Sequence, residues 1–229
     1  MSSKEQAQAE SNILTFLRVR PSKEPSGYFS TDDLNPDSIL FSLPDNFKSD
    51  YINNSKLRHA FHFNGIIGAS ASQEEVFKKV GMAAVNNALD GYNSTIFAYG
   101  QTGSGKTFTL TGGVERFVDR GIIPRAISMV FKEFSKRTTE TFKLYISYME
   151  LYNDEGYDLL DKSQNSKTLE ELPKVQMLED EYGNFHLRNL SLNVAETEEE
   201  ALNLLFQGDT NRAIAETPMN LVSYLCVCL

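Results

Sequence analysis

The residues with the clearest chemical meaning lie between Gly100 and Thr107 and read GQTGSGKT. They fit the pattern G-x-x-x-x-G-K-[ST], in which glycines let the backbone curl so that successive N–H groups point at phosphate oxygens. The Lys106 ammonium would reach the terminal phosphates, and the Thr107 hydroxyl would ligate Mg²⁺. The pattern therefore predicts a nucleotide phosphate loop made of Gly100, Gln101, Thr102, Gly103, Ser104, Gly105, Lys106 and Thr107.

The flanking sequence favours a phosphate site over the alternative of a chance glycine-rich turn. Residues 95–99 are mostly β-branched or aromatic and end at Gly100, which indicates a buried strand leading into the loop. A preceding strand and a following helix are the context that a phosphate loop requires, because the helix start adds a favourable dipole. This helix is interrupted by Gly112 and Gly113 and resumes near Pro124, so residues 114–121 are expected to loop out beside the nucleotide. A tolerated insertion without function is the alternative.

The rest of the sequence alternates between strand and helix patterns. Strands are expected at residues 13–19, 38–43, 60–67 and 142–152, and a hairpin over 175–187 that turns at 182–184. Helices are expected from the capping boxes at 72–75 and 197–200 and from Pro124, with loops over most of 22–54 and over 163–173. This alternation predicts an α/β fold whose sheet is covered by helices on both faces.

Composition narrows the class of protein. A length of 229 residues fits one large domain, and the formal net charge of -9 argues against a nucleic-acid binder. The polar N-terminus and the lack of an apolar run of about 18 residues argue against a signal peptide and a membrane span. The two cysteines, Cys226 and Cys228, predict no disulfide framework and fit a reducing, cytoplasmic setting; palmitoylation or metal binding there is the less favoured alternative.

Residues 90–112, DGYNSTIFAYGQTGSGKTFTLTG, together with the interrupted helix, closely resemble the kinesin motor family. Further matches follow in chain order: RVRP at 18–21, GIIPR at 121–125, YMELYN at 148–153, then Gly208, Arg212 and TPMN at 217–220. They extend over residues 13–220, which are predicted to form a partial motor domain after a polar leader at 1–12. Residues 198–212 and 215–220 are most similar to the kinesin-9 family, which is associated with cilia and flagella.

The resemblance implies a P-loop NTPase fold with a central mixed β-sheet flanked by helices on both faces. It implies ATP or ADP with Mg²⁺ as cofactors, microtubules as the partner through an interface that is mostly missing here, and a location in the cytoplasm and cytoskeleton. The kinesin-9 resemblance adds the cilium or flagellum as an alternative location. Arg18, Arg20 and Pro21 would border the adenine, and Phe108 would stack on it. On the residues alone, a solvent-facing strand edge is the alternative for the two arginines, and a core aromatic is the alternative for Phe108.

The sequence departs from the family after Asn220, where kinesins continue x-x-S-S-R-S-H. Tyr224 and Leu225 stand where a switch serine and the switch arginine are expected, within a divergent apolar tail at 221–229. We therefore expect a sheet that is incomplete at the C-terminus, no intact catalytic residues, and nucleotide binding that exceeds hydrolysis. Three functions remain open: a microtubule-associated ATPase, a truncated isoform that binds nucleotide without acting as a motor, and an unrelated P-loop kinase or ATPase. The first-strand match at 18–21 disfavours the third, and the net charge of -9 fits poorly with an acidic microtubule surface.

Overall fold

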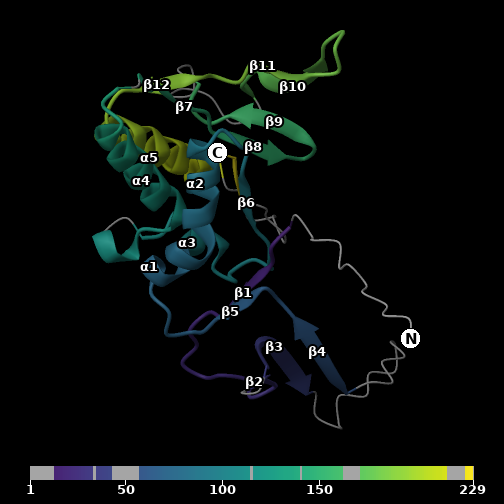
Figure 1. Cartoon of the computed structure of the whole chain (residues 1–229). Helices are drawn as coiled ribbons and strands as arrows, with labels where there is room; N and C mark the ends of the chain where they lie inside the picture. Colours follow the sequence, from purple (N-terminus) through teal and green to yellow (C-terminus); the bar gives the residue numbers. More distant parts are fainter. Residues whose placement is uncertain are drawn as a thin grey trace, which may run out of the picture. The chain divides into compact units, whose positions relative to one another are not determined.

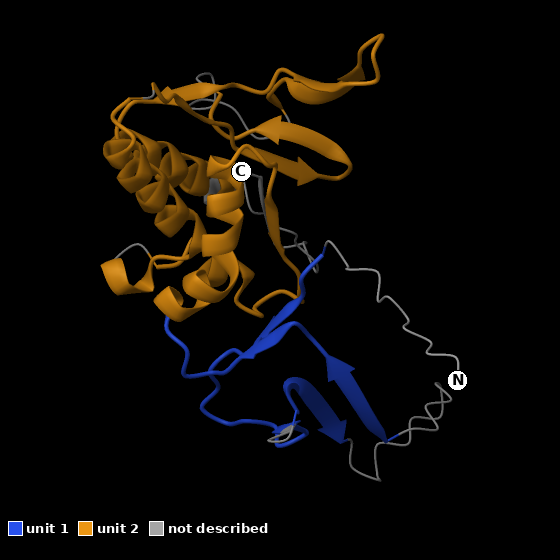
Figure 2. Cartoon of the chain, viewed as in Figure 1, with its two compact units in different colours: residues 1–72 blue, residues 73–229 orange. Residues whose placement is uncertain are grey.

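The structure is a computed structural model, and it describes residues 13–32, 35–42, 57–113, 116–139, 141–161, 171–215 and 225–228. The chain divides into two compact units, Met1–Ser72 and Gln73–Leu229 (Figure 2). The first unit is built of strands, and the second contains all the described helices and the remaining strands (Figure 1).

The first unit holds two small sheets. One is the parallel pair of β1 (Phe16–Arg18) and β5 (Gly65–Ile67), and the other is antiparallel in the order β2 (Phe29–Asp32), β3 (Asn35–Ser42), β4 (Arg58–His62). The single strand predicted at 60–67 is wrong, because the chain changes sheets between His62 and Gly65. The Phe63 amide donates to the Asp37 carbonyl at 2.9 Å, and the Asn64 amide donates to the Thr15 carbonyl at 2.8 Å.

The second unit begins with the helix predicted from its capping box. It consists of three consecutive segments, α1 (Gln73–Val76), the π-helical η1 (Phe77–Gly81) and α2 (Met82–Leu89), and it ends at Asp90 as predicted. The other helical segments of this unit are α3 (Lys106–Leu110), the 3-10 turn η2 (Phe117–Asp119), α4 (Ile122–Lys136) and α5 (Glu198–Ala215).

Helices α4 and α5 lie side by side and share a hydrophobic core cluster of this unit (Figure 1). Ile127 of α4 packs with Ala201, Leu202 and Leu205 of α5. The predicted capping box at the start of α5 is confirmed, since the Glu200 amide donates to Thr197 Oγ1 at 3.2 Å. The helix therefore starts where its sequence signal places it.

The strands of the second unit form three hydrogen-bonded groups. β8 (Met149–Tyr152), β9 (Glu155–Asp158), β10 (Lys174–Glu179) and β11 (Phe185–Arg188) form an antiparallel sheet in the order β11-β10-β9-β8. β7 (Leu144–Ile146) pairs with β12 (Asn193–Ala195), and β6 (Thr95–Ala98) pairs with β13 (Leu225–Cys228). Together with the parallel pair β1 and β5, these strands give the mixed α/β class that the sequence predicts.

Two details of the strand prediction are corrected. The continuous strand expected at 142–152 is split into β7 and β8 by Ser147 and Tyr148. The following residues form a tight turn in which Asn153 and Asp154 have φ of 50° and 63°, so the chain reverses directly into β9. The predicted hairpin is confirmed as β10 and β11. In the part of the chain that the structure describes, no helix is long and apolar enough to cross a membrane.

Candidate phosphate-binding site

The predicted phosphate loop lies between β6 and α3 in the second unit. Gly103 and Gly105 have φ of 78° and 100°, a left-handed backbone that residues with a Cβ rarely adopt. Gly105 is the residue immediately before α3, which begins at Lys106. The strand, loop and helix context required by the motif is therefore present, with glycine where the backbone needs it.

The Lys106 side chain is held inside the loop. Its Nζ atom donates to the carbonyl oxygens of Gly100 at 2.8 Å and Gln101 at 3.0 Å, and the residue is only 7% exposed. The two carbonyl oxygens accept hydrogen bonds from the ammonium group but do not neutralise its charge. A buried ammonium in this setting favours an anion close to the loop, because burial of an uncompensated charge is costly.

Thr107 and Phe108 follow Lys106 on α3, and both are exposed, Phe108 to 45%. The alternative that Phe108 is a core aromatic is therefore wrong. The Thr107 hydroxyl, as a single protein ligand, also fits the expected Mg²⁺. This ion is usually bound by few protein oxygens together with substrate phosphates. Among the described residues there is no group of three His, Cys, Asp or Glu side chains that could hold a metal without such help.

The segment after α3 returns to the end of that helix through close backbone contacts. α3 ends at Leu110, and the Gly121 amide donates to the Thr111 carbonyl at 2.9 Å just before α4 begins. The Gly113 amide donates to the Asp119 carbonyl at 3.0 Å. The predicted interruption and restart of the helix are thus confirmed, although α4 begins two residues before Pro124.

Gln73 is a residue of this region that sequence reasoning missed. Its side chain is 4% exposed, and Nε2 donates to the Phe108 carbonyl at 2.6 Å and the Asp119 carbonyl at 3.0 Å. One amide group therefore ties the start of α1 to both α3 and η2. The sequence places Gln73 only in the capping-box pattern at 72–75. That pattern indicates the local start of a helix and says nothing about contacts with α3 or η2.

The residues predicted to border the adenine lie in the first unit. Arg18 ends β1 and is half-buried, and burial lowers the pKa of its guanidinium. Arg20 and Pro21 are exposed just after this strand. Because these residues and the phosphate loop belong to different units, their convergence on one nucleotide stays a prediction.

Two of the residues predicted to lead towards the first switch, Gly208 and Arg212, lie on α5. The Tyr148 hydroxyl donates to Asp209 Oδ1 at 2.7 Å, and Arg212 Nη2 lies 3.3 Å from the same oxygen. Gly208 allows this contact, since a Cβ there would lie 2.0 Å from a Tyr148 ring carbon. Residues 217–220 and 221–224 lie outside the described residues, and Leu225 begins β13.

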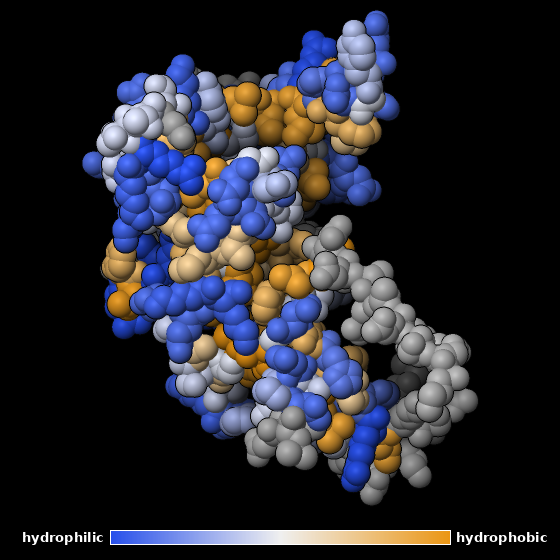
Figure 3. All heavy atoms as spheres, in the orientation of Figure 1, coloured by the Kyte–Doolittle hydropathy of each residue, from blue (hydrophilic) through white to orange (hydrophobic). Residues whose placement is uncertain are grey.

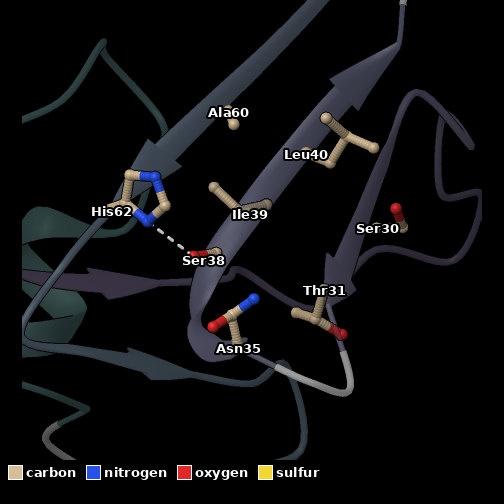
Figure 4. A pocket seen from close by; sticks show the side chains of 8 residues that line it. All are labelled: Ser30, Thr31, Asn35, Ser38, Ile39, Leu40, Ala60 and His62. Atoms are coloured by element: carbon tan, nitrogen blue, oxygen red, sulfur yellow. Dashed lines mark hydrogen bonds between the residues drawn. The ribbon is translucent and has the colours of Figure 1, made fainter.

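The structure also contains a cavity of about 410 Å³ in the first unit (Figure 4). None of the predicted site residues lines it. Ser38 and His62 form a hydrogen bond of 2.6 Å at its edge, between neighbouring strands β3 and β4. This bond joins one strand pair within the sheet of the first unit.

The fold and the loop define an α/β nucleotide-binding protein of the phosphate-loop class. Residues 8–224 match the family described as "Kinesin motor domain", and the chain belongs to this family. It is 37% identical over 208 residues to "Kinesin-like protein KIF9" of Mus musculus and 35% identical over 210 residues to "Kinesin-like protein KLP1" of Chlamydomonas reinhardtii. Each alignment covers 91% of this chain and 26% of the relative, so the chain spans about a quarter of the length of these relatives.

These comparisons confirm the resemblance to the kinesin family and its kinesin-9 members. They contradict the alternative of an unrelated P-loop kinase or ATPase. They do not favour the non-motor alternative over a motor function. Members of the kinesin motor family bind nucleotide together with Mg²⁺, which agrees with the cofactor class that the loop predicts.

Proposed function

We propose that this chain is the ATP-binding part of a kinesin that moves along microtubules. The observation that carries the proposal is the loop itself, in which Lys106 is buried among carbonyl oxygens at the start of α3. A terminal phosphate would supply the negative charge that these carbonyl groups do not. Family membership supports microtubules as the track and the cytoskeleton as the location.

In this proposal, residues 100–107 hold the phosphates of ATP or ADP, and the Thr107 hydroxyl ligates the accompanying Mg²⁺. Arg18, Arg20 and Pro21 border the adenine, while Phe108 stacks on its ring. The exposed ring of Phe108 is compatible with this role. The similarity to KIF9 and KLP1 supports a further proposal, that the protein works in a cilium or flagellum.

The test is a titration of a fluorescent ATP analogue in the presence of Mg²⁺. We expect Lys106→Ala to weaken binding by roughly 10- to 100-fold, because a hydrogen bond to a charged group contributes about 1.5–3 kcal/mol. The matched control is Lys132→Ala, which removes an exposed lysine from α4 and should bind like wild type. Equal affinity for wild type and Lys106→Ala would refute the assignment of the loop.

The rate of phosphate release, measured with and without microtubules, distinguishes a motor ATPase from a protein that only binds nucleotide. A motor ATPase hydrolyses ATP faster when microtubules are added, since the track and the nucleotide then bias the same conformational equilibrium. Hydrolysis that stays at its basal rate with saturating microtubules, together with normal nucleotide affinity, would favour the binding function. Neither result depends on the outcome for Lys106→Ala.

A further inference from the structure

The Gln73 side chain, at the start of α1, bonds to the backbone of the residue that the proposed function places on the adenine. Its Nε2 atom donates to the Phe108 carbonyl oxygen at 2.6 Å and to the Asp119 carbonyl oxygen at 3.0 Å. The residue is buried, and a buried amide that loses its partners is costly. The two N–H groups of one amide therefore hold α3 and η2 to the same point.

The end of α3 leaves the Phe108 carbonyl available to Gln73. In a continued α-helix this carbonyl would accept a hydrogen bond from the amide four residues further on, which is that of Gly112. The Gly112 amide instead donates to the Thr107 carbonyl at 3.0 Å. The Gln73 side chain thus takes the place of a helical donor at the last turn of α3.

The two ends of α3 are held by different contacts. The helix has five residues, too few to be stable by itself. At its start, the Lys106 ammonium group binds two carbonyl oxygens of the phosphate loop, and near its end Leu110 is buried in the core. Loss of the Gln73 amide should therefore shift Phe108 without unfolding α3 or opening the phosphate loop.

The neighbouring turn η2 is held by its backbone rather than by its apolar side chains. Phe117 and Val118 are 67% and 63% exposed, and Figure 3 shows hydrophobic residues among hydrophilic ones at the place where Figure 1 draws η2. The last residue of η2, Asp119, accepts a hydrogen bond from the Gly113 amide at 3.0 Å in addition to the bond from Gln73. The same amide that supports Phe108 therefore also holds the segment that loops out after α3.

We propose that Gln73 is a positioning residue for recognition of the nucleotide base. It orients Phe108 for stacking on the base, while the phosphates are bound by residues 100–107 without its help. The inference rests on the proposed function, since it takes Phe108 as the residue that stacks on adenine. It predicts that Gln73 contributes to the affinity for ATP and not to the affinity for a triphosphate that lacks a base.

The test measures binding of two ligands to the full chain by isothermal titration calorimetry, Mg²⁺-ATP and Mg²⁺ with inorganic triphosphate. Phe108→Ala should weaken ATP binding roughly 5- to 150-fold, which corresponds to the loss of base stacking on an aromatic side chain. Gln73→Leu should weaken ATP binding roughly 3- to 10-fold, the order of one hydrogen bond, and should change binding of inorganic triphosphate by less than about twofold.

A double variant distinguishes positioning from a general effect on stability. If Gln73 acts through Phe108, the variant that combines Gln73→Leu with Phe108→Ala should bind ATP like Phe108→Ala alone. Gln73→Asn keeps the amide on a shorter side chain, and it should show the same selective loss even if Gln73→Leu does not fold. Gln207→Leu is the matched control, because it makes the same change at an exposed position of α5, and it should bind both ligands like wild type.

The proposal is overturned if the Gln73 variants lose affinity for ATP and for inorganic triphosphate equally, or if they bind ATP like wild type. Additive losses in the double variant would also overturn it, since Gln73 would then not act through Phe108. Equal binding of the two ligands by wild type would remove the stacking role and this inference with it, but would leave the phosphate loop intact. Binding of neither ligand by wild type would instead refute the proposed function itself.

Discussion

At the scale of single residues, Gly121 is a place where the backbone passes close to α3. A Cβ on this residue would lie 2.5 Å from the Leu110 carbonyl oxygen and 2.7 Å from that of Thr109. Both obstacles are backbone atoms, which cannot move without disturbing the helix that follows the phosphate loop. We therefore expect Gly121→Ala to lower the free energy of unfolding by about 1–3 kcal/mol, the usual cost of overpacking.

Urea unfolding measures this effect, with a lower midpoint and an unchanged slope as the expected result. Gly68→Ala is the control, since no atom lies within 4 Å of a Cβ built there. Its stability should equal that of wild type or exceed it slightly, because alanine restricts the unfolded chain. A Gly121→Ala protein as stable as the control would mean that the backbone around Leu110 adjusts freely.

The Asp180 carboxylate organises the tip of the β10–β11 hairpin, and this gives a prediction about pH. Hydrogen bonds from His186 and Asn184, and from the amide of Tyr182, hold its pKa well below the ordinary value. Because the folded pKa is depressed, the stability that these bonds contribute is fully present above the unfolded pKa of about 3.9, and it is lost as the pH falls from there through the lower folded pKa.

An NMR titration of the Asp180 carboxyl carbon checks the direction of this shift. We expect a midpoint below 3.9, and we expect the amides of Tyr182 and Asn184 to lose their hydrogen-bonded shifts in the same titration. Asp180→Asn should abolish this acid transition at the turn. A midpoint at or above 3.9 in the wild type would contradict the hydrogen-bonded arrangement.

Single residues differ in how far the sequence alone could predict their roles. Lys106 and Gly105 belong to a contiguous motif, so their placement follows from a short stretch of sequence. Gln73 depends on the carbonyls of Phe108 and Asp119, which are 35 and 46 residues away. No local pattern encodes such a contact, and it becomes visible only when the elements have been packed.

At the scale of elements, α5 is joined to the segment between β7 and β8 by Tyr148. Its hydroxyl donates to Asp209, and its ring lies against Gly208. Tyr148→Phe keeps the ring and removes one hydrogen bond, so the free energy of unfolding should fall by about 0.5–1.5 kcal/mol. Tyr145→Phe is the matched control, because Tyr145 is 51% exposed and its loss of a hydroxyl should have little effect.

The same pair of variants predicts a difference at alkaline pH. Burial, and then the hydrogen bond to Asp209, raise the pKa of Tyr148 above its ordinary value. A raised folded pKa contributes stability that is present below the unfolded pKa of about 10 and is lost as the pH rises above it. Wild type should therefore lose more stability than Tyr148→Phe between pH 9 and 11, and equal losses would contradict this.

Elements were predictable where their signals are local. The capping box of α5 and the turn of the β10–β11 hairpin are each encoded within a few residues. The strand predicted at 142–152 ends where expected, but the sequence did not predict the reversal into β9, because that reversal requires positive φ at two non-glycine residues, Asn153 and Asp154. The break between β7 and β8 also escaped prediction, since it follows from pairing with β12 on one side and β9 on the other.

At the scale of the whole molecule, the strand that leads into the phosphate loop is paired with a strand from the far end of the sequence. β6, which leads into the loop, is paired antiparallel with β13, with Phe97 opposite Cys226 and Ile96 opposite Val227. The sequence indicated only a divergent apolar tail here, because a short β-prone segment does not specify its partner. Pairing with β13 provides the backbone of β6 with hydrogen bonds along one edge.

A proline scan of β13 tests whether this pairing supports the loop. In an antiparallel ladder, consecutive residues alternate between donating into the neighbouring strand and pointing away from it. Of Cys226→Pro and Val227→Pro, one should therefore remove a ladder bond to β6 while the other removes an outward N–H. Each variant is thus the matched control for the other.

We expect one of the two proline variants to weaken binding of the fluorescent ATP analogue and to lower the unfolding midpoint, while the other stays closer to wild type. The reason is that proline within a paired strand removes a donor and disturbs the neighbouring bonds, whereas an outward position tolerates it better. Val227→Thr, which keeps the backbone donor, should bind nucleotide like wild type. If both proline variants retain wild-type affinity and stability, β6 positions the phosphate loop without β13, and the support must come from α3 and the carbonyl groups around Lys106.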